Sequence, residues 1–132
     1  MREIKYRVWC KNKNEWEKDL IAILPSGALL HHIGHSSYRP CSRDSHIVVF
    51  YTGLKDRNGV DIYDGDLLSG IDPNGETIPM FEVEFDHGIG MWIFYDDFDG
   101  YDYTSIHCAA EMGYEFEIFG NVYENPDLIN EA

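Results

Sequence analysis

The side chains best suited to bind a metal ion gather between residues 31 and 46. His31 and His35 lie four residues apart, a spacing that brings two side chains together on a helix, but Gly34 and the serines beside it disfavour a helix. No spacing in this segment matches a familiar zinc motif. We therefore predict an exposed polar loop rather than a metal site. The candidate ligands are His31, His32, His35, Cys41 and His46.

Nucleophilic catalysis would need a thiol or hydroxyl beside a histidine. Cys108 follows His107, but consecutive strand residues point to opposite faces, so this adjacency is not a catalytic pairing. The three cysteines, which include Cys10 and Cys41, are odd in number and widely spaced, and this favours free thiols over a disulfide framework. No Gly-rich phosphate motif occurs. We expect no catalytic residue, no cofactor and no enzyme activity.

An acidic segment, DDFDGYD, occupies residues 96–102. An EF-hand calcium loop spaces its carboxylates as Asp-x-Asp-x-Asp-Gly and carries a Glu at its twelfth position. Here Asp97, Asp99 and Gly100 stand too close together, and the terminal Glu is missing. A solvated acidic loop is the prediction, with weak cation binding as the alternative.

Charge is distributed unevenly along the chain. All ten Lys and Arg residues lie at or before Arg57, whereas eighteen of the twenty-four Asp and Glu residues lie after it. Residues 1–57 therefore carry a net charge of +4 and residues 58–132 carry −18, which together give the −14 of the chain. Phosphate contacts need Lys and Arg, so the C-terminal half is excluded as a nucleic-acid-binding surface. Such asymmetry indicates an interaction surface.

Some of the acidic residues occur in predicted strands, which indicates where on the fold the negative charge lies. In the segments IPMFEVEF and YEFEIF, Glu alternates with aromatic or β-branched residues, as in half-buried strands. If the two strands lie side by side, they and the 96–102 loop form one acidic face. Like charges opposite each other destabilise a sheet, so we expect a balancing partner, with solubility alone as the alternative explanation. The residues of this face are Glu82, Glu84, Asp96, Asp97, Asp99, Asp102, Glu115 and Glu117.

The elements that must position these residues are mostly strands. The chain of 132 residues is 14% aromatic, which favours strands and one domain with a core. Residues 2–9 alternate like a strand, and residues 20–24 and 28–33 flank a Pro-Ser-Gly hairpin turn. Residues 46–53 predict a buried strand. Residues 104–113 predict a short helix ending at Gly113, or a strand, and Asn125 with Pro126 predicts a short C-terminal helix.

Four segments carry a resemblance to a known family: MREIKYRVWCKNKNEW at the start, YTGLKDRNGVDIYDGDLL at 51–68, VEFDHGIGMW at 83–92 and IFGNVYENPDLI at 118–129. Together they resemble the YopX family of uncharacterised phage and prophage proteins. The resemblance implies a mainly β protein with an SH3-like barrel in its C-terminal part, and it supplies no reaction, cofactor or catalytic residue. The 51–68 segment consists of turn formers and core residues, so we interpret it as scaffolding rather than a ligand loop.

We therefore expect an N-terminal β-hairpin region with a variable His/Ser-rich loop over residues 1–46, and an SH3-like barrel over 47–132 that ends in a short helix. The predicted function is that of a non-enzymatic phage accessory protein acting by protein–protein contact through its acidic face. Its partner is itself, in a head-to-tail homo-oligomer, or a basic host or phage protein for which the face mimics DNA.

The alternative is a nucleic-acid-associated factor that contacts phosphate through its basic N-terminal segment. No apolar run approaches the roughly 20 residues that span a bilayer, and the start lacks the apolar core of a signal peptide. We expect a cytoplasmic protein of a bacterial host cell, without a membrane partner. The cations of the alternative are Arg2, Lys5, Arg7, Lys11, Lys13 and Lys18.

Overall fold

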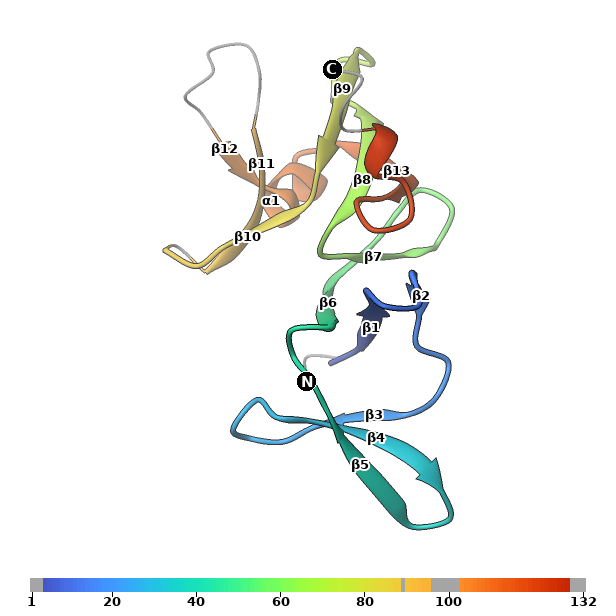
Figure 1. Ribbon diagram of the computed structural model, residues 1–132. Helices are drawn as coiled ribbons and strands as arrows, with labels where there is room; N and C mark the ends of the chain where they lie inside the picture. Colours follow the sequence, from blue (N-terminus) through green and yellow to red (C-terminus); the bar gives the residue numbers. More distant parts are fainter. Residues whose placement is uncertain (1–3, 89, 96–102, 129–132) are drawn as a thin grey trace. The chain divides into compact units, whose positions relative to one another are not determined.

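The computed structural model describes residues 4–88, 90–95 and 103–128 (Figure 1). The fold is mainly β, as predicted. No helix among these residues is both long and apolar enough to cross a membrane. The elements are β1 (Tyr6–Cys10), β2 (Glu15–Trp16), β3 (Ile21–Ile23), β4 (Leu29–Gly34), β5 (Ser37–Cys41), β6 (His46–Lys55), β7 (Asp61–Tyr63), β8 (Asp66–Ile71), β9 (Thr77–Glu82), β10 (Glu84–Asp86), β11 (Met91–Tyr95), β12 (Tyr103–Ser105), α1 (Ile106–Glu111), β13 (Glu115–Asn121) and the 3₁₀ helix η1 (Pro126–Leu128).

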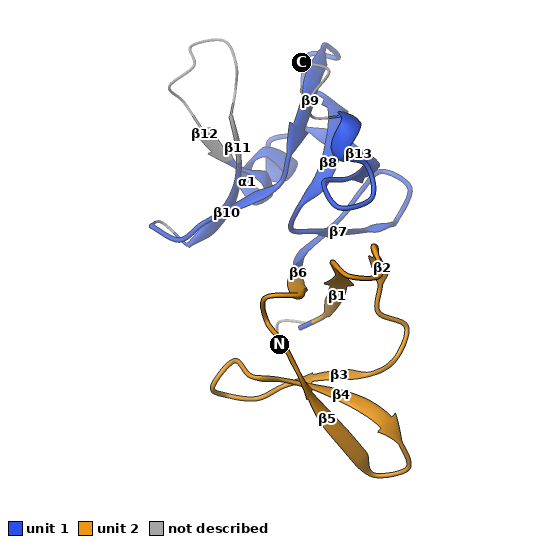
Figure 2. Cartoon of the chain, viewed as in Figure 1, with its two compact units in different colours: residues 1–4, 50–132 blue, residues 5–49 orange. Residues whose placement is uncertain are grey.

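The chain divides into two compact units (Figure 2). The N-terminal unit comprises residues 5–49, and the C-terminal unit comprises residues 50–132 with 1–4. The division falls within β6, three residues beyond the expected boundary at 46/47. The charge asymmetry follows it: the N-terminal unit holds seven basic and four acidic residues, a net +3, and the C-terminal unit holds three basic and twenty acidic residues, a net −17.

The N-terminal unit is built from hairpins. Strand β1 pairs with β2 in the register Trp9↔Trp16 and Cys10↔Glu15, and β1 lies between β2 and β6 in its sheet. Strands β3, β4 and β5 form a separate antiparallel sheet. A small core of Val8, Ile21 and Leu29 holds the unit together, with Cys41 and other half-buried residues packed against it.

The predicted His/Ser loop is wrong in part, because residues 29–41 form the β4–β5 hairpin. The two strands pair from Leu29↔Cys41 to Gly34↔Ser37, with a register shift after His32. Side chains 37–40 are all exposed, so the strand shows no alternation of apolar and polar residues. Backbone pairing and a ring contact between His32 and Tyr38 hold it, and neither leaves a periodic pattern in a sequence.

The C-terminal unit contains two three-stranded sheets, β13-β8-β9 and β10-β11-β12, and its strands curl into a half-barrel (Figure 1). Residues 78–85 were predicted as one strand, but the strand breaks at Val83. The Val83 amide donates to Asp66 O at 2.9 Å, and its carbonyl accepts from the Gly65 amide at 2.9 Å. The chain leaves β8 at this point and continues into β10, which pairs with β11.

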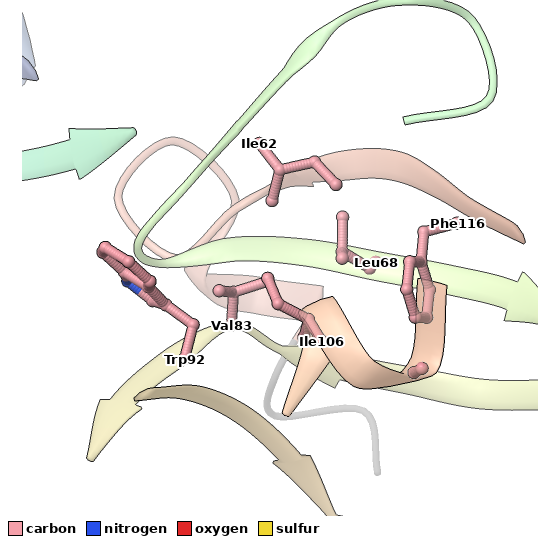
Figure 3. Packing of buried hydrophobic residues seen from close by; sticks show 7 residues of the cluster. Ile62, Leu68, Val83, Trp92, Ile106 and Phe116 are labelled. Atoms are coloured by element: carbon pink, nitrogen blue, oxygen red, sulfur yellow. The ribbon is translucent and has the colours of Figure 1, made fainter. Parts of the chain in front are cut away.

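Apolar side chains from both sheets and the helix fill the core of this unit. Figure 3 shows Leu68, Val83, Ile106 and Phe116 converging, with Ile62 and Trp92 beside them. Helix α1 begins after Ser105, whose hydroxyl accepts from the His107 and Cys108 amides. It ends before Gly113, which adopts a φ of +105° that favours glycine. Of the two alternatives for residues 104–113, the helix is therefore confirmed.

Two turns of the C-terminal unit repeat one sequence pattern, Asp-x-Asn-Gly. Asp56 Oδ1 accepts from the amides of Asn58 and Val60 at 2.8 and 2.9 Å. Asp72 Oδ1 accepts from the amides two and four residues on, both at 2.9 Å. Only Asp56 is buried, and its Oδ2 also accepts from the Ile118 amide at 3.2 Å. The first turn is thereby fastened to β13.

Other polar residues of the 51–68 segment are likewise bound to backbone. The Thr52 hydroxyl donates to Ile62 O at 2.8 Å, and the Asp66 carboxylate accepts from the Tyr63 amide at 2.8 Å. Both side chains are buried. These bonds give the segment a structural role.

The C-terminal helix is a single 3₁₀ turn, η1. Asn125 does not cap it in the predicted way, because its Oδ1 accepts from the Asn121 amide at 3.2 Å. Its backbone carbonyl instead accepts from the Leu128 amide at 3.1 Å.

Candidate functional site

Four of the predicted acidic-face residues lie in described strands, but those strands are not neighbours. Strands β9 and β13 flank β8 on opposite sides, so the side-by-side arrangement expected from sequence is wrong. Glu82 stands opposite Leu67, and Glu117 stands opposite Ser69, on the same strand β8. Because residues 67 and 69 lie two apart, Glu82 and Glu117 share one face of the sheet, across β8 from each other.

The same face continues along β13. Glu115, opposite Ile71, is exposed, and so are Glu117 and Phe119. The alternate residues Phe116 and Ile118 turn to the core side. Phe119 lies at the register shift between Ile118 and Gly120, so its face is not set by alternation, but exposed carboxylates and an exposed aromatic residue follow one another along β13. A mixture of polar and aromatic groups is common in protein interfaces. The remaining predicted residues, Asp96, Asp97, Asp99 and Asp102, lie outside the described residues.

A tighter acidic group lies at the break between β9 and β10. Glu82 and Glu84 flank Val83 there, and Asp64 follows β7 close to both. Partial burial raises the pKa of Glu82, and the charges of Glu84 and Asp64 raise it further. Burial also raises the pKa of Asp64, with a further contribution from Glu84 that is partly offset by His87 and by a backbone hydrogen bond. We call Asp64, Glu82 and Glu84 the carboxylate cluster.

Sequence analysis missed Asp64. It lies in the Tyr-Asp-Gly-Asp segment, where Asp66 supplies the turn contact. Only the fold brings Asp64 near the two glutamates, since the intervening residues run through β8 and β9. The one signal in the sequence was the first Asp of this segment, Asp64, because the turn contact comes from Asp66.

Basic side chains are scarce in this unit. Residues 58–132 contain no Lys or Arg, and Lys55 donates to Asp61 Oδ1 at 2.9 Å. A groove of about 360 Å³ runs along the start of β13, lined by residues 54–57, Ala110 and residues 114–116. Glu115 contributes to it, so the acidic face continues into a concave surface beside Arg57.

The predicted metal-ligand candidates do not all converge. His32 Nε2 bonds His35 O at 2.7 Å, and His35 is exposed. His31 Nε2 lies 3.1 Å from Asp19 Oδ2, and His46 Nε2 lies 3.5 Å from Glu17 Oε1. Sequence analysis missed Glu17 and also Cys10, which joins His46 through strand pairing rather than through any local motif. In the C-terminal unit, His107 Nε2 bonds Thr52 O at 2.8 Å, and Cys108 is exposed on α1.

Comparisons with known proteins agree on one family. A family model described as YopX protein matches residues 5–130. The crystal structure of protein yopX from Bacillus subtilis superposes with a TM-score of 0.66 and 24% identity, covering 97% of this chain and 98% of that one. Protein EF1440 from Enterococcus faecalis gives a TM-score of 0.62 at 24% identity, covering 98% and 99%. At this identity, the two structures show a shared fold. No curated protein matches the chain.

Proposed function

Because this chain belongs to the YopX family, a family of unknown function, we propose that it is a non-enzymatic accessory protein of a phage or prophage that acts by protein–protein contact. The contact surface is the acidic face of its C-terminal unit, with the curled sheets serving as an SH3-like platform. Glu82, Glu84, Glu115 and Glu117 belong to this surface, and Asp64 is added to it.

The carboxylate cluster is the observation that carries this proposal. Burial raises the pKa values of Asp64 and Glu82, and the charge of Glu84 raises both further, so holding these carboxylates together in the folded state costs free energy at neutral pH. A cationic side chain supplied by a partner would remove that cost and gain charge-assisted hydrogen bonds. Surface features that cost stability are commonly retained for function.

The partner's chemistry follows from charge. A Lys- or Arg-rich protein segment fits the cluster, whereas phosphate would be repelled. One source of such a segment is the N-terminal unit of a second copy, with its net charge of +3. A basic host or phage protein is the other source, and the face would then act as a DNA mimic in the cytoplasm of a bacterial host.

The nucleic-acid alternative is weaker. Arg7 stacks over the Trp16 ring at 4.1 Å, and Lys13 pairs with Glu17 at 3.4 Å. Two of the six cations on which this alternative depends are therefore engaged within the N-terminal unit. Arg2 lies outside the described residues.

The first test is light scattering after size exclusion at low salt and at about 0.5 M salt, where the screening length falls to about 4 Å. Oligomers that dissociate as salt rises support a contact between oppositely charged units. A monomer at both salt concentrations rules out a second copy of this chain as the partner and leaves a basic host or phage protein as the candidate. DNA retention that weakens steeply with salt would support the nucleic-acid alternative instead.

A second test uses a Lys-rich peptide as the probe and calorimetry as the readout. The double variant Glu82→Gln/Glu84→Gln should weaken binding about tenfold or more, as expected when charges in direct contact are lost. The control Glu76→Gln/Glu111→Gln removes the same charge at exposed positions outside the cluster. Equal binding by both variants would mean that only net charge attracts the peptide, and the acidic face would not be the contact surface.

A further inference from the structure

We propose that the N-terminal unit binds one Zn²⁺ ion through Cys10 Sγ, the Glu17 carboxylate and His46 Nε2. This site lies in the N-terminal unit. The proposed function uses that unit only as a source of positive charge. The site therefore stands independently of the acidic face.

The three candidate ligand atoms lie close together. Cys10, Glu17 and His46 each offer one atom, and these atoms all lie within 4.8 Å of one another. Zinc binds nitrogen and oxygen at about 2.0–2.2 Å in a tetrahedron, which sets neighbouring ligand atoms about 3.4 Å apart. His46 Nε2 and Glu17 Oε1 are 3.5 Å apart. A zinc ion fits between them with little rearrangement.

Backbone hydrogen bonds fix the positions from which these side chains project. Cys10 ends β1, opposite Glu15 of β2. The Glu17 amide donates to Val8 O at 2.8 Å, which brings the residue after the hairpin back beside β1. The Lys11 amide donates to Ser45 O at 2.8 Å, which places the start of β6 next to the end of β1. The ligands thus come from a hairpin and a neighbouring strand, and rigid elements of this kind suit a metal site.

The imidazole of His46 is oriented as in a zinc ligand. Its Nδ1 lies 2.9 Å from both Ser42 O and Ser45 Oγ. The carbonyl only accepts, and the Ser45 hydroxyl donates to Ser42 O at 3.2 Å, so Nδ1 carries the hydrogen. In the neutral ring, Nε2 then presents its lone pair to Glu17. A proton or a metal ion between these two acceptors would satisfy both, and we assign the metal ion. Metal-bound histidines commonly donate their other ring nitrogen to a backbone carbonyl in the same way.

Burial makes Glu17 an unusual carboxylate. Its side chain is only 3% exposed, and that of His46 is 11% exposed. The ammonium of Lys13 stands 3.4 Å from Glu17 Oε1, longer than the roughly 2.7–2.9 Å of a strong charge-assisted bond. Cys10 is also buried. A divalent ion bound directly to the Glu17 carboxylate and the Cys10 sulfur would neutralise this buried site more fully than the partly exposed Lys13 ammonium does.

The fourth position of the tetrahedron falls to water. Cys41 ends β5 and packs against the same core as Val8, but it is not among the residues whose ligand atoms lie within 4.8 Å of one another. Zinc with three protein ligands keeps a water in the remaining position.

A second group in the same unit competes for Glu17. Asp19 and His31 place ligand atoms within 4.8 Å of it. In this second group, the Asp19 side chain is 65% exposed, and none of the residues offers a sulfur ligand. Thiolate ligands favour zinc over magnesium and calcium, so the group containing Cys10 is the better zinc site, and the test must separate the two.

Because the N-terminal unit is small, a bound zinc ion would add to its stability. Residues 5–49 contain one small apolar cluster, of Val8, Ile21 and Leu29, and the other buried apolar residues of the unit are Trp9, Cys10 and Val49. Chain segments of about 40 residues usually need a metal, disulfides or oligomerisation for stability. The cysteines of this unit are free thiols, which leaves them available as ligands.

Cobalt substitution of the full chain tests the site. Co²⁺ added to the reduced, metal-free protein should bind one equivalent and give visible bands of a tetrahedral centre with a thiolate-to-cobalt charge-transfer band. Added Zn²⁺ should displace it. Cys41→Ser should leave the charge-transfer band unchanged, because Cys41 is not one of the three ligands. Absence of a stoichiometric tetrahedral spectrum overturns the proposal.

Matched variants locate the site. Cys10→Ser should abolish the charge-transfer band, and His46→Asn should weaken affinity by at least about 100-fold, since losing a group that only hydrogen-bonds a ligand already costs 10–100-fold. The controls Cys108→Ser and His32→Gln should leave binding unchanged. If Cys10→Ser does not fold by circular dichroism, His46→Asn decides. If His46→Asn binds normally while His31→Gln loses the metal, the ion sits at Asp19 and His31 and the proposal is wrong.

Discussion

The two units of this protein are stabilised in different ways. The C-terminal unit packs seven buried residues into one apolar core and ties its buried acids Asp56 and Asp66 to backbone amides. The N-terminal unit has an apolar cluster of three buried residues and places Cys10, Glu17 and His46 together near it. Burial of apolar surface grows with chain length. We infer that apolar packing stabilises the larger unit and that the smaller one depends on polar and metal contacts.

Truncating buried core residues should give the largest difference in stability between the two units. Leu68→Ala removes a fully buried side chain of the C-terminal core and should destabilise the protein by about 2–5 kcal/mol in urea unfolding. Leu29→Ala, in the N-terminal core, should cost less because fewer buried neighbours surround the cavity. Met112→Ala, at an exposed position, should stay within about 0.5 kcal/mol. Equal losses for the two leucines would refute the contrast between the cores.

Metal removal is expected to act on one unit only. Zinc at about 100 times its dissociation constant should stabilise the folded N-terminal unit by about 2.7 kcal/mol, and a chelator should remove this gain. In a Trp92→Phe variant, the remaining Trp9 and Trp16 both lie in the N-terminal unit, so their emission follows its unfolding. A shift that persists in Cys10→Ser would show that zinc acts elsewhere.

Comparing the two Asp-x-Asn-Gly turns separates the contribution of a tertiary hydrogen bond from that of the turn itself. Asp56→Asn loses the bond that Oδ2 accepts from the Ile118 amide and leaves a buried amide group, so we expect a loss of about 1–3 kcal/mol. Asp72→Asn changes the same local turn without a bond to β13 and should cost less than about 1 kcal/mol. Urea unfolding of both variants measures the difference. Similar losses would mean that the turn itself, rather than its link to β13, stabilises the unit.

The smallest effect concerns pH. The folded state raises the pKa of Asp64 above its ordinary 3.8, so the folded protein holds this proton to a higher pH than the unfolded chain, and stability falls as pH rises through that window. Asp64→Asn should therefore stabilise the protein at pH 7, by roughly 0.2–1 kcal/mol, as for like-charged neighbours in a sheet. The gain should vanish below about pH 4. Asp127→Asn, at an exposed position, should show no such trend.

Local patterns in the sequence predicted the elements that have one buried face. The alternation of Glu115, Phe116 and Glu117 with their neighbours predicted β13, and Ser105 and Gly113 bound α1 where a helix was one of two alternatives. The β4–β5 hairpin was missed because side chains 37–40 are exposed on both faces. The break at Val83 was missed because it depends on hydrogen bonds to residues 65 and 66 of another strand.

The candidate sites were less predictable than the fold. Glu82 and Glu84 were identified from alternation, but Asp64 joins them only through the curl of the sheet. Cys10 and His46 stand 36 positions apart in the sequence, and the hydrogen bond between Lys11 and Ser45 brings them together. Pairing of distant strands has no local signal, so sites assembled by it cannot be deduced from spacing.

The turn at Asp56 also determines how a partner can approach β13. This strand is at the edge of its sheet, and exposed edges attract strand addition and aggregation. Two of its backbone groups are already bonded to the turn: the Phe116 carbonyl accepts from the Arg57 amide, and the Ile118 amide donates to Asp56 Oδ2. A visiting strand that paired with this stretch would have to displace the turn first. The turn therefore favours recognition through side chains over strand addition at residues 116–118, and it opposes edge-to-edge aggregation there.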